Sequence, residues 1–504
     1  MDCGISRVKW LVSVVQKLKN PEIIADIRPD RRFLATLRPY QQKGINWLHI
    51  LHSLGFGACL ADDMGLGKTI QLLGFLNVIR SGPLKASLLV IPASLIANWM
   101  GEIERFFPDL RYKVAHPSAP SERNVRKGDK KELDGLDLVI TTYGQAQKLS
   151  SLQEYAWRYV ILDEAQAIKN PGARQTLAIK KLKAENRICM TGTPVENRLF
   201  DLWSLFDFLN PGMLGNKSEF GSLAKKLRQN AEGYGRLRNV IRPYLLRRLK
   251  TDKSVISDLP DKVELKTYAS LSKKQIVLYR NHIQQIEQDL AESDGIQRKG
   301  LILASLMKLK QLCNHADQYL GTGGFDEKDS GKFERLREVC EVIHEKREKV
   351  LIFSQFKEMT APLCAFLEGV FSRKGLVLHG STPVRQRKDI IERFQGDERI
   401  PFMVLSLKAG GVGLNLTRAN HVVHFDRWWN PAVENQATDR AFRIGQKKNV
   451  MVHKFITRGT VEEKIDRMLE EKATLSKEVI AASGEAWITE MSNQEIMGLF
   501  SLAL

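Results

Sequence analysis

The sequence is poor in cysteine and has no long hydrophobic run, and both absences exclude whole classes of protein. Its six cysteines, in 504 residues, never form a C-x-x-C pair, which argues against a disulfide framework and against a zinc module. No stretch reaches about 18 uninterrupted apolar residues, so we expect no segment that spans a membrane. The first residues also lack the basic and then apolar layout of a secretory signal. These absences predict a soluble protein of a reducing, intracellular compartment.

Acidic residues are the scarcer charge. The chain has 58 Asp and Glu against 77 Lys and Arg, a formal net charge of +19 at pH 7. Such an excess favours a polyanionic partner, because each phosphate that a Lys or Arg neutralises releases condensed counterions. A basic surface that serves only solubility would give the same excess. Charge therefore favours nucleic acid as a partner without establishing it.

Hydrophobic patterning divides the chain into two similar parts with a helical region between them. From residue 56 to 208, and again after 349, short apolar runs alternate with amphipathic stretches, which is typical of buried parallel strands joined by crossover helices. Residues 211–325 instead space Leu, Lys and Gln as helices do. The sequence thus predicts an α/β fold of two lobes with parallel sheets. Near the end, Ser492-Asn-Gln-Glu495 fits a capping box that starts a last short helix.

A glycine-rich loop lies between a predicted strand and a predicted helix. The strand Ala58–Leu60 runs into Ala61-Asp-Asp-Met-Gly-Leu-Gly-Lys-Thr69, and a helical pattern follows. In a phosphate-binding loop the glycines let backbone N–H groups close around phosphates, while Lys68 would reach the β- and γ-oxygens and Thr69 would ligate Mg²⁺. The strict pattern requires glycine at position 62, where this chain has Asp62. Taken alone, the G-K-T triplet could be chance.

Two adjacent carboxylates, Asp163 and Glu164, end another predicted strand of the same lobe. Asp163 can hold Mg²⁺, usually through water, and Glu164 can orient and deprotonate an attacking water. An isolated Asp-Glu pair would more often cap the next helix. The phosphate loop upstream in the same lobe favours the catalytic interpretation, so the two elements together predict a nucleotide-hydrolysing site.

A third candidate element, Gln436-Ala-Thr-Asp-Arg-Ala-Phe-Arg443, lies in the second lobe. Gln436, Arg440 and Arg443 are spaced by four and three residues, which predicts one face of a helix. Such a face is most often simply solvated. Placed across a cleft from a phosphate loop, the two arginines could instead stabilise charge on a transferring γ-phosphoryl group. The lobes would then have to close, so hydrolysis would be coupled to their motion.

These motifs resemble those of the SWI/SNF-type (sucrose-non-fermenting) DNA-dependent ATPases and translocases of helicase superfamily 2, and the general pattern is most similar to bacterial members. The resemblance covers roughly residues 35 to 470, in the family's order. It departs from many members at Gln166 and Phe442, where they have His. Besides the loop and the acidic pair, it rests on Leu37-Arg-Pro-Tyr-Gln41, Met190-Thr-Gly-Thr-Pro194, Ser406-Leu-Lys-Ala-Gly-Gly-Val-Gly-Leu-Asn-Leu416, Trp429-Asn-Pro431 and the segment Gln436–Gln446.

The resemblance implies an enzyme that uses ATP and Mg²⁺, with two RecA-like lobes and helical protrusions inserted between them. Its catalytic residues would be Lys68, Asp163, Glu164, Arg440 and Arg443, with Thr69 and Asp163 at the metal. Gln41 would sense adenine. The other nucleotide-binding residues would be Asp63, Met64, Gly65, Leu66, Gly67, Lys68, Thr69, Gly413 and Gln436. The implied domains are an N-terminal helical extension (1–36), lobe 1 with the ATP site (37–210), helical protrusions and linker (211–325), lobe 2 (326–470) and a C-terminal helical tail (471–504).

A translocase tracks the DNA backbone, so it needs phosphate contacts on both lobes rather than base readout. The DNA-binding candidates implied by the resemblance are Asn98, Trp99, Thr142, Lys408 and Trp429. A tryptophan such as Trp429 could equally pack in a core. The basic side chains of Arg247, Arg248 and Lys250 have two possible roles as well: they could bind phosphate or form a solvated helix face.

The expected function is an ATP-driven double-stranded DNA translocase that remodels or displaces protein–DNA complexes. We expect a monomer that acts in the cytoplasm on the nucleoid if bacterial, or in the nucleus if eukaryotic. A strand-separating DNA or RNA helicase with the same motor is the alternative. A non-enzymatic scaffold would be expected to lose Lys68, Glu164 or an arginine, and all are present.

Overall fold

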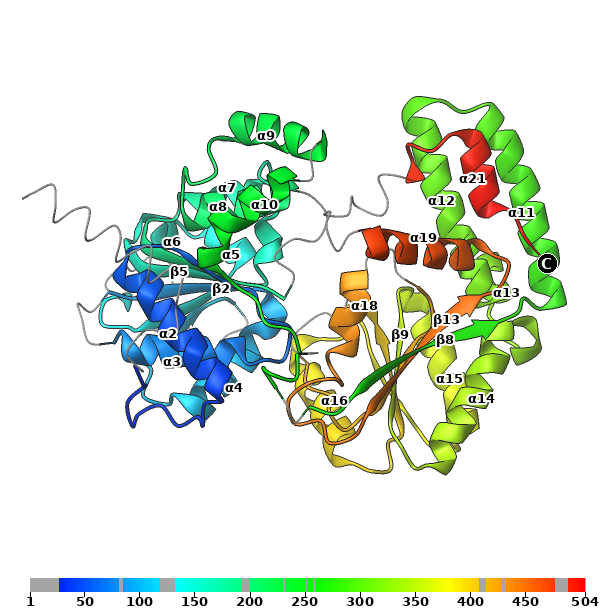
Figure 1. Cartoon of the computed structure of the whole chain (residues 1–504). Helices are drawn as coiled ribbons and strands as arrows, with labels where there is room; N and C mark the ends of the chain where they lie inside the picture. Colours follow the sequence, from blue (N-terminus) through cyan, green and yellow to red (C-terminus); the bar gives the residue numbers. More distant parts are fainter. Residues whose placement is uncertain are drawn as a thin grey trace, which may run out of the picture. The chain divides into compact units, whose positions relative to one another are not determined.

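The chain forms two compact units, Met1–Ser257 and Asp258–Leu504, each built around a parallel sheet (Figure 1). This confirms the predicted fold class of two α/β lobes. The computed structural model describes residues 27–80, 85–117, 132–192, 199–229, 232–250, 252–256, 259–407, 414–427, 431–475 and 488–503. Most of the predicted N-terminal extension, and the predicted site residues Lys408, Gly413 and Trp429, lie outside these ranges.

The first unit contains a seven-stranded sheet in the order β3-β4-β2-β5-β6-β1-β7. Every neighbouring pair is parallel, and every residue of the inner strands β2 and β4 is buried, as expected for a sheet covered on both faces. The carboxyl ends of β1, β5 and β6 therefore meet at one edge. The strands are β1 (Ala58–Leu60), β2 (Ser87–Ile91), β3 (Tyr112–Ala115), β4 (Leu138–Thr142), β5 (Trp157–Asp163), β6 (Ala184–Met190) and β7 (Leu245–Leu246).

Helices of the first unit follow the alternation expected from the sequence. Helix α8 is apolar on nearly all sides, and eight of its eleven residues are buried, so it packs into the core. The next two helices, α9 and α10, precede the return of the chain to the sheet as β7 (Figure 1). The helices are α2 (Pro39–Ser53), α3 (Lys68–Val78), α4 (Ile96–Phe106), α5 (Tyr143–Lys148), α6 (Ser150–Glu154), α7 (Arg174–Lys181), α8 (Leu199–Leu209), α9 (Lys217–Gln229) and α10 (Glu232–Ile241).

The second unit contains a six-stranded parallel sheet in the order β10-β11-β9-β12-β13-β8. Its edge strand β8 pairs with β13 over eight residues, from Lys262 opposite Val450 to Ala269 opposite Thr457. The strands are β8 (Lys262–Ala269), β9 (Val350–Ser354), β10 (Leu376–Leu378), β11 (Phe402–Ser406), β12 (His421–His424) and β13 (Val450–Thr457).

A helical hairpin, α11 and α12, has its own hydrophobic core within the second unit, and the last helix α21 packs against it (Figure 1). The capping box predicted at Ser492 and Glu495 is confirmed at the start of α21. The helices of this unit are α11 (Lys273–Ala291), α12 (Gly295–Asn314), α13 (Ala316–Leu320), α14 (Gly331–Glu345), α15 (Thr360–Phe371), α16 (Val384–Gly396), α18 (Pro431–Thr438), α19 (Val461–Leu475) and α21 (Asn493–Phe500). Within the described ranges, no helix is long and apolar enough to cross a membrane.

The region expected to be helical, residues 211–325, contributes two strands as well as helices. Strand β7 is only two residues long and lies within the basic segment of residues 242–250, so its sequence carries little strand signal. Strand β8 alternates apolar and charged residues, a pattern that does indicate a half-buried strand, but Val263 and Leu265 are still more than a third exposed. The region belongs partly to each unit, because the units divide between Ser257 and Asp258.

Candidate nucleotide-binding site

The glycine-rich loop has the strand–loop–helix geometry of a phosphate-binding loop. Strand β1 ends at Leu60, and Lys68 is the first residue of α3, with Thr69 following in its first turn. Gly65 and Gly67 have φ angles of 84° and 78°, in the left-handed region that favours glycine. The Lys68 ammonium donates a hydrogen bond to the Asp62 carbonyl oxygen at 2.6 Å. The free N–H groups at the start of α3 and the Lys68 charge together suit an anionic phosphate.

Gln41 lies directly beside this loop, and its role in sensing adenine stays a prediction. It sits in the first turn of α2, where its Oε1 accepts the Arg38 N–H at 3.0 Å. Its Nε2 donates to the Leu66 carbonyl oxygen at 3.2 Å, and the Tyr40 hydroxyl donates to the same oxygen at 3.0 Å. A Cβ on Gly67 would approach Gln41 Nε2 to 2.5 Å. The start of α2 and the loop are therefore packed together without room for a larger residue.

Asp163 and Glu164 lie at the carboxyl end of β5, which is separated from β1 by β6 alone. Asp163 Oδ2 accepts the indole N–H of Trp99 at 2.9 Å, and Asp163 Oδ1 accepts the Glu164 backbone N–H at 2.9 Å. The Tyr143 hydroxyl donates to the Asp163 carbonyl oxygen at 2.8 Å. Glu164 has a φ of 51°, a left-handed conformation that is strained for a residue with a side chain. Such strain is common at functional sites because the surroundings enforce it.

Burial and, after it, the charge of Glu164 together raise the pKa of Asp163 to about 6, against the opposing effects of the Trp99 hydrogen bond and the Lys68 ammonium. The loop and the acidic pair lie at the same edge of the sheet, because β1 and β5 both run parallel to β6, which separates them. A buried carboxyl next to another negative charge is stabilised in its ionised form by a cation. Oxygen ligands from Asp163 and Thr69 fit Mg²⁺, which usually takes one or two protein ligands beside phosphate oxygens.

Gln166 connects the acidic pair to the end of β6. Its Nε2 donates to Glu164 Oε2 at 2.7 Å, and its Oε1 accepts a hydrogen bond from the Thr191 hydroxyl at 3.0 Å. An amide can donate and accept at once, so Gln166 performs here the bridging that a histidine could perform. The departure from the family pattern at this position therefore keeps a connection between Glu164 and Thr191.

The structure corrects the DNA-binding prediction for Trp99. Its side chain is 1% exposed and its indole donates to Asp163, so the side chain supports the acidic pair and is not exposed on the surface for a DNA contact. Thr142 is also buried, and its hydroxyl accepts the Gln145 N–H at 3.3 Å as the N-cap of α5. Asn98 lies on α4 and is partly exposed, so its DNA contact stays a prediction.

The prediction that Gln436, Arg440 and Arg443 share one helical face is wrong. Helix α18 ends at Thr438, so Gln436 lies in the helix and both arginines follow it. The chain turns there because the Arg440 carbonyl accepts the Leu416 N–H at 2.9 Å, and Gly445 adopts a φ of 99°. Arg440 is buried, at 4% exposure, which excludes a solvated face for it. The expected role of these arginines at the γ-phosphate stays a prediction.

Sequence reasoning missed the true position of Arg248 and Lys250, which had been expected to bind phosphate or to be solvated. Arg248 Nε donates to the buried carboxylate of Asp62 at 2.9 Å. Lys250 is 4% exposed, and its backbone N–H donates to Asp63 Oδ2 at 3.0 Å. Both residues therefore support the phosphate loop. The replacement of glycine by Asp62 is the one sequence signal that could have pointed to a buried basic partner.

A second cluster missed from the sequence lies at the carboxyl ends of β9 and β12. Lys332 Nζ pairs with Glu462 at 2.7 Å, with both side chains fully buried, and also donates to Asn314 Oδ1 at 3.1 Å. Asp426 accepts the Gln355 N–H at 2.8 Å. Lys310, whose pKa burial lowers to about 8, donates to Gln355 Oε1 at 2.9 Å. These contacts attach α12 and α14 to the carboxyl ends of β9 and β12, and Trp429 follows β12 in the sequence.

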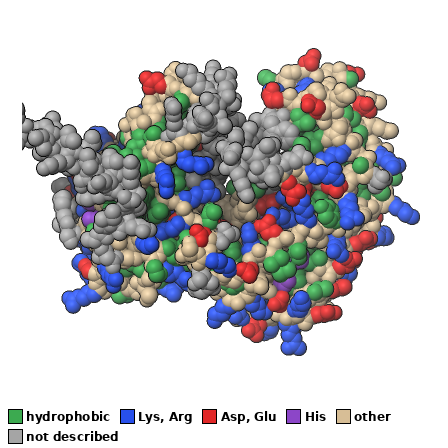
Figure 2. Space-filling view, viewed as in Figure 1, with side chains coloured by type: hydrophobic (Ala, Val, Ile, Leu, Met, Phe, Trp, Pro, Cys, Tyr) green, Lys and Arg blue, Asp and Glu red, His purple; other side chains and the backbone are tan. Residues whose placement is uncertain are grey.

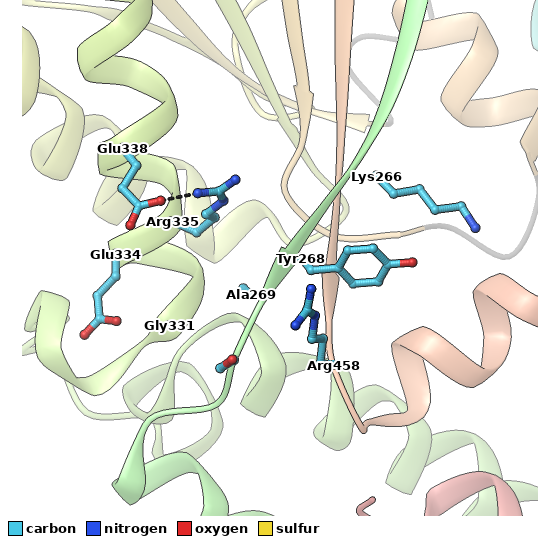
Figure 3. A pocket seen from close by; sticks show the side chains of 9 residues that line it. Lys266, Tyr268, Ala269, Gly331, Glu334, Arg335, Glu338 and Arg458 are labelled. Atoms are coloured by element: carbon cyan, nitrogen blue, oxygen red, sulfur yellow. Dashed lines mark hydrogen bonds and ion pairs between the residues drawn. The ribbon is translucent and has the colours of Figure 1, made fainter. Parts of the chain in front are cut away.

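A groove of about 440 Å³ in the second unit contains none of the predicted site residues (Figure 3). It lies between β8 and α14, and its charges are largely paired within the protein. Arg335 pairs with Glu338, Lys266 pairs with Asp466 at 2.8 Å, and the Arg458 guanidinium lies 5.0 Å from the centre of the Tyr268 ring. The candidate nucleotide-binding site is therefore not this groove but the edge of the first sheet where the phosphate loop follows β1.

Comparison with known families agrees with this geometry. Residues 40–318 match the SNF2-related domain, and residues 331–445 match the helicase conserved C-terminal domain. The chain belongs to the SNF2-related family. The resemblance found in the sequence is thus confirmed, and the SNF2-related match includes the phosphate loop, Asp163 and Glu164.

The SNF2-related relatives come from bacteria and from eukaryotes. The chain is 45% identical to YwqA of Bacillus subtilis, described as an ATP-dependent helicase/translocase, over 98% of this chain and 54% of that protein. It is 36% identical to the mouse SWI/SNF-related matrix-associated actin-dependent regulator of chromatin subfamily A member 1, over 93% and 46% respectively. The solved SWI2/SNF2 ATPase core of Sulfolobus solfataricus in complex with dsDNA is 41% identical, covers 95% of this chain and all of that one, and has a TM-score of 0.47. The chain spans about half the length of the curated relatives that it matches.

Proposed function

We propose that this chain is the ATP-hydrolysing motor of a double-stranded DNA translocase that remodels or displaces protein–DNA complexes. One observation carries the ATPase part of the proposal: a phosphate loop with Lys68 follows β1 and an acidic pair with Asp163 ends β5, so that both lie at one edge of one parallel sheet. Membership of the SNF2-related family supports the motor, and so does the description of YwqA as an ATP-dependent helicase/translocase.

The net charge of +19 supports a nucleic-acid partner. On the face shown in Figure 2, Lys and Arg side chains are spread over both units and do not form one compact patch. Such a distribution suits a partner whose charge extends along a backbone, because each neutralised phosphate releases counterions. The proposed DNA contacts remain Asn98, Thr142, Lys408 and Trp429. Because the side chain of Thr142 is buried, a contact there would involve its backbone and the neighbouring residues.

In this proposal Lys68 and the N–H groups of α3 bind the phosphates, and Gln41 recognises adenine. Thr69 and Asp163 hold Mg²⁺, which supplies neutralisation of phosphate charge when bound. Glu164, held by Gln166, accepts a proton from the attacking water. Arg440 and Arg443 stabilise charge at the γ-phosphate. The remaining nucleotide contacts come from residues 63–67, Gly413 and Gln436, and the motor acts as a monomer.

The deciding experiment measures the steady-state ATPase rate without nucleic acid and with duplex DNA, single-stranded DNA or duplex RNA. Duplex DNA should stimulate most, with little dependence on sequence, and the stimulation should weaken as salt rises because counterion release drives binding. Stronger stimulation by single-stranded DNA or duplex RNA would contradict the translocase proposal. It would favour the alternative, a strand-separating helicase with the same motor.

A further inference from the structure

Asp62 occupies the loop position where the strict phosphate-loop pattern has glycine, and its side chain is completely buried. Its Oδ1 accepts the backbone N–H of Arg248 at 3.1 Å and the Nε–H of Arg248 at 2.9 Å. Its Oδ2 accepts Gln71 Nε2–H at 3.0 Å and pairs with the Arg248 guanidinium. A buried carboxylate is tolerated only when it is paired and hydrogen-bonded. Arg248 supplies the positive charge and most of the hydrogen bonds that the buried Asp62 carboxylate needs.

The Arg248 side chain also contacts two other parts of the site. Its guanidinium donates to the Tyr40 carbonyl oxygen and lies 5.1 Å from the centre of the Tyr40 ring, at the start of α2 beside Gln41. It donates to Gln71 Oε1 at 2.7 Å, one turn along α3 from Lys68. One planar fork with five N–H donors thus joins the turn that carries Gln41, the loop and α3. A lysine cannot make this set of contacts, because its ammonium is a single point of charge.

The backbone around Arg248 runs alongside the first residues of the loop. The Ala61 N–H donates to the Leu246 carbonyl at 2.7 Å, and the Asp63 N–H donates to the Arg248 carbonyl at 3.0 Å. Strand β7 itself pairs in parallel with β1. Since β7 follows α9 and α10, the chain returning from these helices is bound to the loop on the side opposite β6.

We propose that Arg248 is a positioning residue for nucleotide binding. Its contact with Asp62 holds the loop backbone in place, and its contact with Tyr40 holds the turn that carries Gln41. Asp62 itself binds Arg248 and not the nucleotide, which is bound by the other residues of the loop. The inference rests on the proposed function in one respect only, that this loop binds ATP.

The test replaces Arg248 by lysine in the full chain, which keeps the positive charge and removes the fork. Loss of charge-assisted hydrogen bonds from the Asp62 pair should raise the Kd for a fluorescent ATP analogue about ten-fold or more. The Kd for duplex DNA should stay close to that of the unchanged protein, and circular dichroism should show that the variant is still folded at the temperature of the binding assay. Arg242→Lys is the matched control, because Arg242 is an exposed arginine of the same basic segment, and it should leave the nucleotide Kd within about two-fold.

A rescue distinguishes positioning from general instability. Arg248→Met leaves the Asp62 carboxylate buried without its counter-charge, so nucleotide affinity should fall further than in Arg248→Lys. Adding Asp62→Asn removes that charge and should restore part of the lost affinity. If Arg248→Lys weakens DNA binding and leaves the nucleotide Kd unchanged, Arg248 is a DNA contact and the inference is wrong; a normal nucleotide Kd in every variant also overturns it. Failure of the proposed function is separate, because the unchanged protein would then show no affinity for ATP.

Discussion

Single side chains in the nucleotide site hold one another in place, which prepares them for different tasks. The Lys68 ammonium is fixed by the Asp62 carbonyl at 2.6 Å, and the Glu164 carboxylate by the Gln166 amide at 2.7 Å. A reacting group that is already fixed in place loses less conformational freedom when the nucleotide binds and reacts, so the entropic cost of both steps is lower. The proposed function assigns phosphate binding to Lys68 and activation of water to Glu164, so their removal should have separable effects.

Lys68→Ala should lose nucleotide affinity and turnover together, because the ammonium balances the charge of the β- and γ-phosphates. Glu164→Gln should keep ATP bound while hydrolysis falls by a factor on the order of 10² to 10⁴, since only proton transfer is removed. Equilibrium binding of a fluorescent ATP analogue, combined with single-turnover hydrolysis, measures both effects. An equal loss of affinity in the two variants would contradict these roles.

The residues that could be predicted from the sequence are those whose meaning lies in a contiguous motif. Lys68, Thr69, Asp163 and Glu164 each follow a recognisable strand and need only local spacing to be identified. Arg248 could not be placed in this way, because its partner Asp62 is 186 positions away and either a solvated or a phosphate-binding arginine would have the same sequence. Trp99 was misplaced for the same reason, since its partner Asp163 is 64 positions away.

Among the elements, β8 depends on charge as much as on hydrophobic burial. Glu264 accepts hydrogen bonds from Lys262 on its own strand and from Lys454 on β13. Burial raises the pKa of Glu264, but the two ammonium groups outweigh burial and lower it to about 2. The carboxylate therefore favours the folded state wherever it is ionised.

Glu264→Gln should reduce the free energy of unfolding at pH 7 by about 1 kcal/mol, a modest value because water screens the partly exposed cluster. The folded pKa lies below the ordinary value of 4.5, so the stabilisation is complete above about pH 4.5 and is lost as the pH falls towards 2. Urea unfolding of both proteins at a series of pH values measures this. The difference between them should shrink through that window, and a constant difference would refute the assignment.

The buried pair of Lys332 on α14 and Glu462 on α19 should be far more sensitive. Lys332→Met removes the ion-pair partner of the buried Glu462 and should cost about 3–5 kcal/mol in the free energy of unfolding of the second unit. The double variant Lys332→Met, Glu462→Gln should recover part of this, because no uncompensated charge remains. Urea unfolding followed by circular dichroism tests the pair, and independent, additive effects of the two substitutions would show that they do not interact.

At the scale of the whole molecule, one chain carries two parallel-sheet units, and it matches the SNF2-related domain over residues 40–318 and the helicase conserved C-terminal domain over residues 331–445. The fold class could be predicted because both sheets produce the same rhythm of buried strands and amphipathic helices. The strands inside residues 211–325 could not, because their assignment depends on which sheet a short or half-exposed segment joins. If residues of the first unit alone carried out hydrolysis, Arg443 of the second unit would have no catalytic role.

Arg443→Ala tests that role. If Arg443 stabilises the γ-phosphate of a nucleotide bound by the first unit, the variant should keep its affinities for ATP and for duplex DNA, while DNA-stimulated hydrolysis falls by a factor on the order of 10³. Nucleotide binding, DNA binding and ATPase rate are measured on the same preparation. A normal stimulated rate would show that Arg443 does not take part in hydrolysis.

The packing of α21 on the α11–α12 hairpin has a consequence for biosynthesis. The core they share includes Tyr279 near its beginning and Phe500 near its end, so its last component leaves the ribosome about 220 residues after its first. Contacts so distant in sequence form late and slowly. The first unit can complete its sheet once β7 has been made, whereas the core of the hairpin is complete only after both α19 and α21 have been made. During that interval the nascent chain exposes the hydrophobic surface of this hairpin, and a chaperone would be expected to bind there.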